Sequence, residues 1–148
     1  MGYKAYLESV STNLSADVIL MLLIKKIAEV MTDNIGYDKM KAVYRAQISK
    51  DINTNYVMGY NRQLYQMFED IFEAGIRKNE LKTNLSPAIL AKHFIMAFRG
   101  ITYEWCVRYP EFDFKAQSVQ HFELMISGLK QSEQSGDGSR TIRGRFCG

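Results

Sequence analysis

The side chains best suited to chemistry in this 148-residue chain are aromatic rings and methionines, not paired acids and bases. Methionine fills irregular space and adapts to varied ligands, whereas tyrosine and tryptophan combine an apolar body with a hydrogen-bonding tip. Eight apolar residues lie on segments of helical periodicity whose faces could converge: Tyr44, Tyr60, Leu64, Met67, Phe68, Phe94, Phe98 and Trp105. Their spacing alone is compatible both with a pocket for a small molecule and with a solid core.

The sequence carries no recognisable catalytic or metal-binding motif. His93 and His121 are its two histidines, each isolated on its predicted helix, and no Glu or Cys lies at a spacing that would build a metal site. Acidic residues cluster within 69–73, but on a helix such a group is usually a solvated face. We therefore predict no enzymatic activity, no metal and no cofactor. A small helical enzyme that depends on His93 or Glu104 is the least favoured alternative.

Composition and charge favour a globular helical protein over a nucleic-acid-binding one. Hydrophobic residues make up 47% of the chain, which has only two prolines. The net charge is +3, and it is +2 without residues 131–148, which hold three arginines. Because a nucleic-acid footprint needs clustered Lys and Arg, and no such cluster precedes the tail, we expect no sequence-specific DNA binding by these residues.

The cysteines and the apolar runs indicate the cellular compartment of the protein and whether it associates with a membrane. Cys106 and Cys147 form neither a disulfide framework nor a metal spacing, which favours a reducing cytoplasm. The seven-residue run Val18–Ile24 is far shorter than a bilayer span. We expect it to be a buried helix and predict no membrane association.

Helical periodicity extends through residues 3–130. The predicted helices span about 3–12, 15–31, 37–52, 55–78, 86–108 and 113–130. Ser15, Ser86 and Asp113 are placed as N-caps, and Asn79 is placed where a left-handed cap ends a helix. Thr32–Gly36 is predicted to be a turn.

Residues 131–148 differ in character from the rest of the chain. The first ten of them are rich in Ser, Gly and Gln and contain no apolar residue. We expect a flexible tail, of native or added origin, after a single domain at 1–130.

The helix predicted at 86–108 has a second face, which the aromatic residues leave free. Ala97 and Gly100 lie on it, and small residues let another helix approach closely. Glycine in mid-helix costs about 1 kcal/mol relative to alanine. A helix with one aromatic face and one face of small residues needs two packing partners, of which one is the core. The other would be a second copy of the chain.

From Glu73 to Leu129, the order of the helix-capping and turn signals and the spacing of the apolar residues resemble the C-terminal, ligand-sensing half of TetR-family transcriptional regulators. The resemblance covers about 3–130. It is carried by Ala74-Gly75-Ile76, Asn79-Glu80-Leu81, Leu90-Ala91, Gly100-Ile101, Trp105, Phe112-Asp113-Phe114 and Gly128-Leu129. The family more often has Gly where Asn79 stands, and the tolerance of Asn for a left-handed backbone explains this departure.

The resemblance implies an all-α, TetR-like C-terminal bundle of five or six helices. In it the last two long helices of each subunit form a four-helix dimer interface, and the eight residues named first line a pocket for a small hydrophobic or aromatic effector. By the same resemblance, the segments 86–108 and 113–130 would form a homodimer interface that includes His93, Met96, Ala97, Gly100, Glu104, His121, Met125 and Gly128.

The resemblance also implies a function, which is effector sensing for a transcriptional repressor. Family members carry a helix-turn-helix domain before the helix that begins near Tyr3, and no such pattern occurs in this sequence. We therefore expect contact with DNA only through a missing N-terminal domain. The alternative is a purely structural helical dimerisation module with a solid core.

Overall fold

The computed structural model describes residues 2–10, 13–50 and 55–130, with side chains from Arg62 onward in the last segment. Within these residues the fold is all-α, as predicted, and no β-strand forms. The elements are α1 (Tyr3–Val10), α2 (Ala16–Glu29), the π-helix η1 (Val30–Ile35), α3 (Tyr37–Ser49), α4 (Asn55–Arg77), α5 (Pro87–Arg108) and α6 (Phe114–Ser127). The predicted tail at 131–148 lies outside the described residues.

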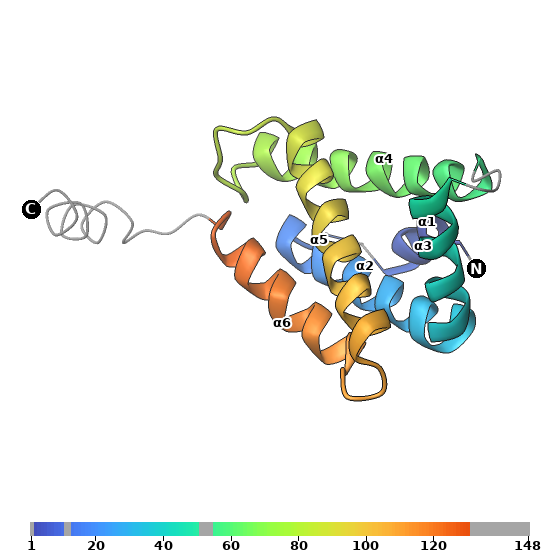
Figure 1. Ribbon diagram of the computed structural model, residues 1–148. Helices are drawn as coiled ribbons and strands as arrows, with labels where there is room; N and C mark the ends of the chain where they lie inside the picture. The colour runs from blue at the N-terminus through green and yellow to red at the C-terminus, as the bar shows by residue number, and fades with distance from the viewer. Residues whose placement is uncertain (1, 11–12, 51–54, 131–148) are drawn as a thin grey trace, which may run out of the picture.

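The helices pack around one hydrophobic core. Figure 1 shows α5 running at a steep angle to α4, α6 turning back alongside α5, and α2 lying behind them. Contacts of α4 with α5, and of α2 with both α4 and α6, close the arrangement. None of the described helices is both long and apolar enough to cross a bilayer.

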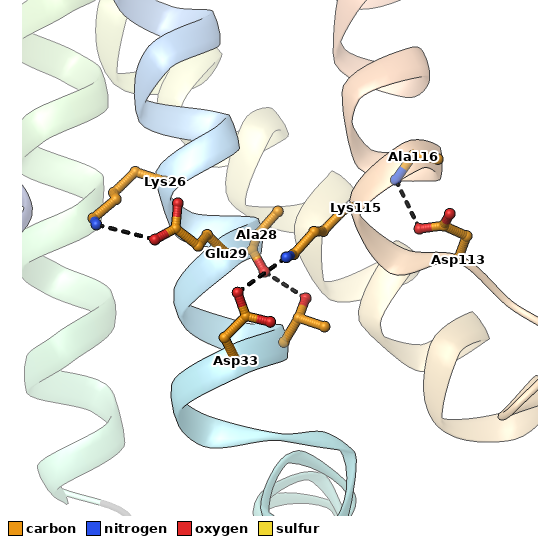
Figure 2. Close-up of polar contacts among 8 residues, drawn as sticks. Lys26, Ala28, Glu29, Asp33, Asp113, Lys115 and Ala116 are labelled. Carbon is orange, nitrogen blue, oxygen red and sulfur yellow. Dashed lines mark hydrogen bonds and ion pairs between the residues drawn. The ribbon is translucent and has the colours of Figure 1, made fainter.

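The caps of α5 and α6 form as predicted. Ser86 Oγ accepts a hydrogen bond from the backbone N–H of Ile89 at 3.2 Å. Asp113 Oδ1 accepts one from the N–H of Ala116 at 3.1 Å, as Figure 2 shows. Each side chain satisfies a donor that the first turn of a helix would otherwise leave unpaired.

The N-terminus of α2 is capped differently from the prediction. Ser15 occupies the N-cap position, but its side chain accepts no hydrogen bond from the helix backbone. Its hydroxyl instead donates to Asp17 Oδ1 at 2.5 Å. The N–H of Ala16 donates to Glu80 Oε1 at 2.9 Å, so a carboxylate from the turn after α4 completes the cap. A negative charge at a helix N-terminus is also favourable to the helix dipole.

The predicted turn at Thr32–Gly36 is wrong, because most of this segment is the π-helix η1, which continues α2. The N–H of Gly36 donates to the carbonyl of Met31, five residues back, at 2.8 Å. Gly36 then ends the segment with a φ of 88°. Asp33 of η1 pairs with Lys115 of α6 at 3.0 Å and ties the two elements together (Figure 2).

Gly75 allows α4 to approach the start of α2 very closely. A Cβ at this position would lie 2.6 Å from Ala16 Cβ and 2.7 Å from Leu81 Cδ1, too close for any real side chain. The carbonyl of Gly75 accepts hydrogen bonds from the N–H groups of Glu80 and Leu81, at 2.8 and 3.2 Å. Asn79, with a φ of 60°, adopts the predicted left-handed conformation that turns the chain back over this glycine.

Gly75→Ala should destabilise the fold by about 1–3 kcal/mol, because the added methyl group forces α2 and Leu81 away from α4. The matched control is Gly100→Ala on α5, where an added Cβ would meet nothing within 4 Å. In a monomeric chain, at protein concentrations too low for self-association, that change should stabilise the helix by about 0.5–1 kcal/mol. Urea unfolding followed by circular dichroism measures both. A Gly75→Ala variant as stable as the wild type would contradict the close packing.

Candidate ligand site and dimer face

Five phenylalanine rings from three helices form a continuous chain of contacts, the aromatic cluster: Phe68 and Phe72 of α4, Phe94 and Phe98 of α5, and Phe122 of α6. Neighbouring ring centroids lie between 4.5 and 6.4 Å apart, within the usual range for favourable aromatic pairs. Each of the five residues is at most 6% exposed. The cluster therefore joins α4, α5 and α6 at the centre of the core.

Trp105 extends this packing along α5, two turns after Phe98. Its ring lies 4.6 Å from that of Phe114 on α6 and 6.3 Å from that of Tyr37 on α3. Tyr37 in turn stacks on Tyr109 at 4.0 Å. Trp105 is 4% exposed and contacts two different helices, so its environment depends on how α3 and α6 sit against α5.

The structure buries five of the eight predicted pocket residues, namely Leu64, Phe68, Phe94, Phe98 and Trp105. Met67 of α4 and Tyr44 of α3 are half-buried. Tyr60 belongs to α4, but its side chain lies outside the described part of the chain. Direct ring contacts bring Phe68, Phe94 and Phe98 into the aromatic cluster, while Trp105 lies beyond it.

Two rings of the aromatic cluster, Phe72 and Phe122, are missing from the predicted pocket. Phe72 follows Phe68 by four residues and so lies on the same face of α4. The spacing could have identified it. Phe122 is absent because the predicted pocket includes no residue of the last helix, whereas α6 contributes its buried face to the core.

Tyr44 and Thr102 place polar groups beside the aromatic residues. Burial raises the pKa of the Tyr44 hydroxyl above its ordinary value, and the neighbouring Thr102 hydroxyl and the charge of Arg99 oppose that rise. Thr102 is fully buried and donates its own hydroxyl to the carbonyl of Phe98 at 2.7 Å. Tyr44 therefore connects α3 to the middle of α5 through a polar contact inside an apolar region.

A separate cavity of about 210 Å³ lies between α1, α2 and α4. None of the eight predicted pocket residues lines it. Its wall combines six apolar residues with three charged ones: Leu7, Leu14, Ala16, Ile19, Ile71, Ala74, Asp70, Lys78 and Glu80. The cavity is thus open space next to α4, on a different side from the aromatic cluster.

An exposed row of residues runs the length of α5. Its members, which we name the α5 stripe, follow one another at alternating intervals of four and three residues: Ile89, His93, Met96, Gly100, Tyr103 and Val107. The apolar members Ile89, Met96, Tyr103 and Val107 are 44 to 60% exposed. At 3.6 residues per turn, the stripe lies on the side of α5 opposite to Phe94, Phe98 and Trp105.

The predicted dimer-interface residues lie on exposed or half-buried surface in this single chain. Those exposed are His93, Met96, Gly100, Glu104, His121 and Gly128. Ala97 and Met125 are half-buried. The prediction omitted Ile89, Tyr103, Val107 and, on α6, Leu124, which is 69% exposed.

No protein-family model matches the chain, and no curated protein or solved structure was found to match it. The resemblance to TetR-family regulators stays a prediction that rests on the residues quoted for it. The candidate sites are therefore the aromatic cluster, with Tyr44 and Thr102 beside it, and the α5 stripe.

Stability should fall at alkaline pH through Tyr44. Since burial raises its folded pKa above the ordinary value of 10.0, the unfolded chain releases this proton first. The contribution of the neutral Tyr44 hydroxyl to the stability of the fold is present below about pH 10 and is lost as the pH rises through the folded pKa. Tyr44→Phe should therefore lose less stability than the wild type between about pH 8 and about pH 11.

Urea unfolding at the two pH values measures this difference. The exposed Tyr109, which lies beyond the α5 stripe, supplies the matched control, because Tyr109→Phe keeps the ring and shows what losing any one tyrosine hydroxyl does. An equal loss of stability in the wild type and in Tyr44→Phe would contradict the buried environment of the Tyr44 hydroxyl.

Proposed function

We propose that this chain is the effector-sensing and dimerising half of a TetR-like transcriptional repressor. It binds a small hydrophobic or aromatic molecule at the aromatic cluster and pairs with a second copy through α5 and α6. The observation that carries the proposal is the two-sided character of α5. One side of this helix packs into the aromatic cluster, and the other exposes the α5 stripe.

The α5 stripe has the pattern of a helix that packs against another helix. Apolar or small residues at alternating intervals of four and three form the seam of helix bundles and coiled coils. Gly100 lies near the middle of the stripe with open space above it, so a second helix can approach the backbone there. The exposed apolar residues of the stripe lie along one side of α5 and make a surface of the kind that marks interaction sites.

A two-fold symmetric pair of chains suits this surface. In such a dimer the same patch of each copy packs against its counterpart, so one stripe supplies both sides of the interface. The second copy would cover Met96 and Tyr103, which in the single chain expose 52% and 58% of their surface.

The aromatic cluster suits an aromatic or apolar effector. Each ring pair contributes only about 0.5–1.5 kcal/mol beyond its buried area. A ligand ring inserted between α4 and α5 would replace contacts between phenylalanines with contacts of the same kind. The free-energy cost of separating the rings is thereby largely offset, and the adaptable Met67 lies next to Phe68 on α4.

Effector binding would be transmitted through α5. A ligand between α4 and α5 shifts α5, and that helix also carries the dimer surface. The geometry of the pair then changes, and with it the separation of DNA-reading elements joined to each copy. Because two half-sites on DNA have a fixed spacing, a small shift between two populated states is enough to release DNA.

A second candidate is a structural dimerisation module with a solid core. Direct contacts between the rings and their exposure of at most 6% favour it, as does the position of the described cavity away from the aromatic cluster. The two candidates share the dimer and differ only in whether the core takes up a ligand.

A hydrophobic effector should stabilise the folded chain and perturb Trp105. At a ligand concentration one hundred times the dissociation constant, binding to the folded state alone adds about 2.7 kcal/mol of stability. A library of hydrophobic and aromatic compounds, screened by melting temperature, identifies such ligands. Trp105 is the only tryptophan, so its fluorescence reports on the core.

Substitutions in the aromatic cluster locate the binding site. Phe68→Leu and Phe98→Leu remove a ring but retain much of the side-chain volume, so they should weaken binding while the chain stays folded. The matched control is Phe112→Leu, which removes a half-buried ring outside the cluster. If no compound changes the melting temperature or the Trp105 fluorescence, the solid-core candidate is correct instead.

The chain should sediment as a dimer at micromolar concentration, and Gly100→Leu should shift it toward monomer by obstructing the approach of the second helix. Gly100 has open space above it, so this change leaves the monomer fold intact. The control is Ala116→Leu, at an exposed position of α6 outside the proposed interface. A wild-type chain that sediments as a monomer at these concentrations would refute the dimer.

A further inference from the structure

We propose that the effector carries a neutral hydrogen-bond acceptor, which the hydroxyl of Ser118 binds inside the core. This inference rests on the proposed function and specifies the chemistry of its ligand. Ser118 of α6 is 0% exposed, and its Oγ has no hydrogen-bond partner. Buried hydroxyl groups are nearly always hydrogen-bonded, so an unpartnered one needs an explanation.

Among the described residues Ser118 and Thr102 are the two with buried hydroxyl groups, and they differ in that only Thr102 has a hydrogen-bond partner. A Ser or Thr in mid-helix commonly donates to the carbonyl four residues back. Thr102 does so, to the carbonyl of Phe98 at 2.7 Å. Ser118 makes no corresponding bond to Phe114. Its proton is therefore available to a group that enters the core.

Ser118 lies between two aromatic contacts that join α6 to α5. On α6, Phe114 precedes it by four residues and Phe122 follows it by four, so all three share a face. The ring of Phe114 lies 4.6 Å from that of Trp105, and the ring of Phe122 lies 4.5 Å from that of Phe98. Ring contacts between the two helices thus occur one turn before and one turn after Ser118.

The same two contacts fix the register of the antiparallel helices. On α5, Thr102 stands between Phe98 and Trp105, as Ser118 stands between their partners on α6. Thr102 and Ser118 are therefore at the same height along the helix pair. Tyr44 of α3 lies near Thr102 and brings a third hydroxyl to this region.

The residues of the core indicate which polar group the ligand carries. The Thr102 proton is committed and the Ser118 proton is free. Because an unsatisfied donor is rarer in a protein core than an unsatisfied acceptor, the ligand group that pairs with Ser118 is an acceptor. Among the described residues, no Lys, Arg or His is buried. A charged acceptor would be costly without a counter-ion. A neutral oxygen on an apolar or aromatic body fits, as in a ketone, an ester or an ether.

Two probes of the same shape test this inference: 2-acetylnaphthalene, which has a carbonyl oxygen, and 2-isopropenylnaphthalene, which has a CH₂ group in its place. Titration calorimetry gives their affinities for the full chain. The wild type should prefer the ketone by about fivefold, the effect of one ordinary hydrogen bond. Ser118→Ala should lose this preference and keep its affinity for the alkene. Ser127→Ala, at an exposed serine of α6, should retain the preference.

The melting temperature of the chain without ligand distinguishes a ligand-binding role of Ser118 from a structural one. Ser118→Ala removes an unpartnered buried hydroxyl, so the variant without ligand should melt at or above the wild-type temperature. Equal binding of both probes by the wild type, or a preference that survives in Ser118→Ala, would overturn the inference but leave the proposed function standing. Binding of neither probe, with no hit from the library, would overturn both.

Discussion

The close contact of Gly75 with Ala16 is the constraint on which the arrangement of the core depends. It lets the end of α4 lie directly on the start of α2, where any side chain at Gly75 would intrude. The turn after α4 then supplies the carboxylate of Glu80 as the cap of α2. Leu81, which is 2% exposed, packs over the same glycine. One missing methyl group thus brings together the ends of two helices and the turn between α4 and α5.

The end of α6 is joined to the same place. The N–H of Lys82 donates to the carbonyl of Leu129 at 2.6 Å, and Lys130 pairs with Asp17 of α2 at 3.3 Å. Hydrogen bonds from Ser15 and Lys130, together with the charge of Lys130, lower the pKa of Asp17 against the opposing effect of burial. With α2, α4 and α6 held at one end, α5 packs across them, and its outer side remains free for a second copy. An effector that moves α5 would act on a helix packed against an otherwise fixed frame.

Local chemistry explains which parts of the fold the sequence could predict. Ser86, Asp113 and Asn79 act on neighbouring backbone groups, so their roles follow from the residue types and positions. The cap of α2 could not be predicted, because Glu80 lies 64 residues beyond Ala16 and reaches it only in the folded chain. The π-helix η1 could not be predicted either, because polar residues followed by a glycine are typical of a turn as well. Periodicity identified most buried rings, but not how α6 divides its residues between core and surface.

A dimer that takes up an apolar effector can be detected directly by sedimentation velocity in the presence of 2-acetylnaphthalene, recorded at a wavelength that only the ligand absorbs. We expect the ligand absorbance to move with a boundary of twice the 17.1 kDa chain mass. Protein that sediments as a monomer, while the ligand absorbance stays behind, would contradict it.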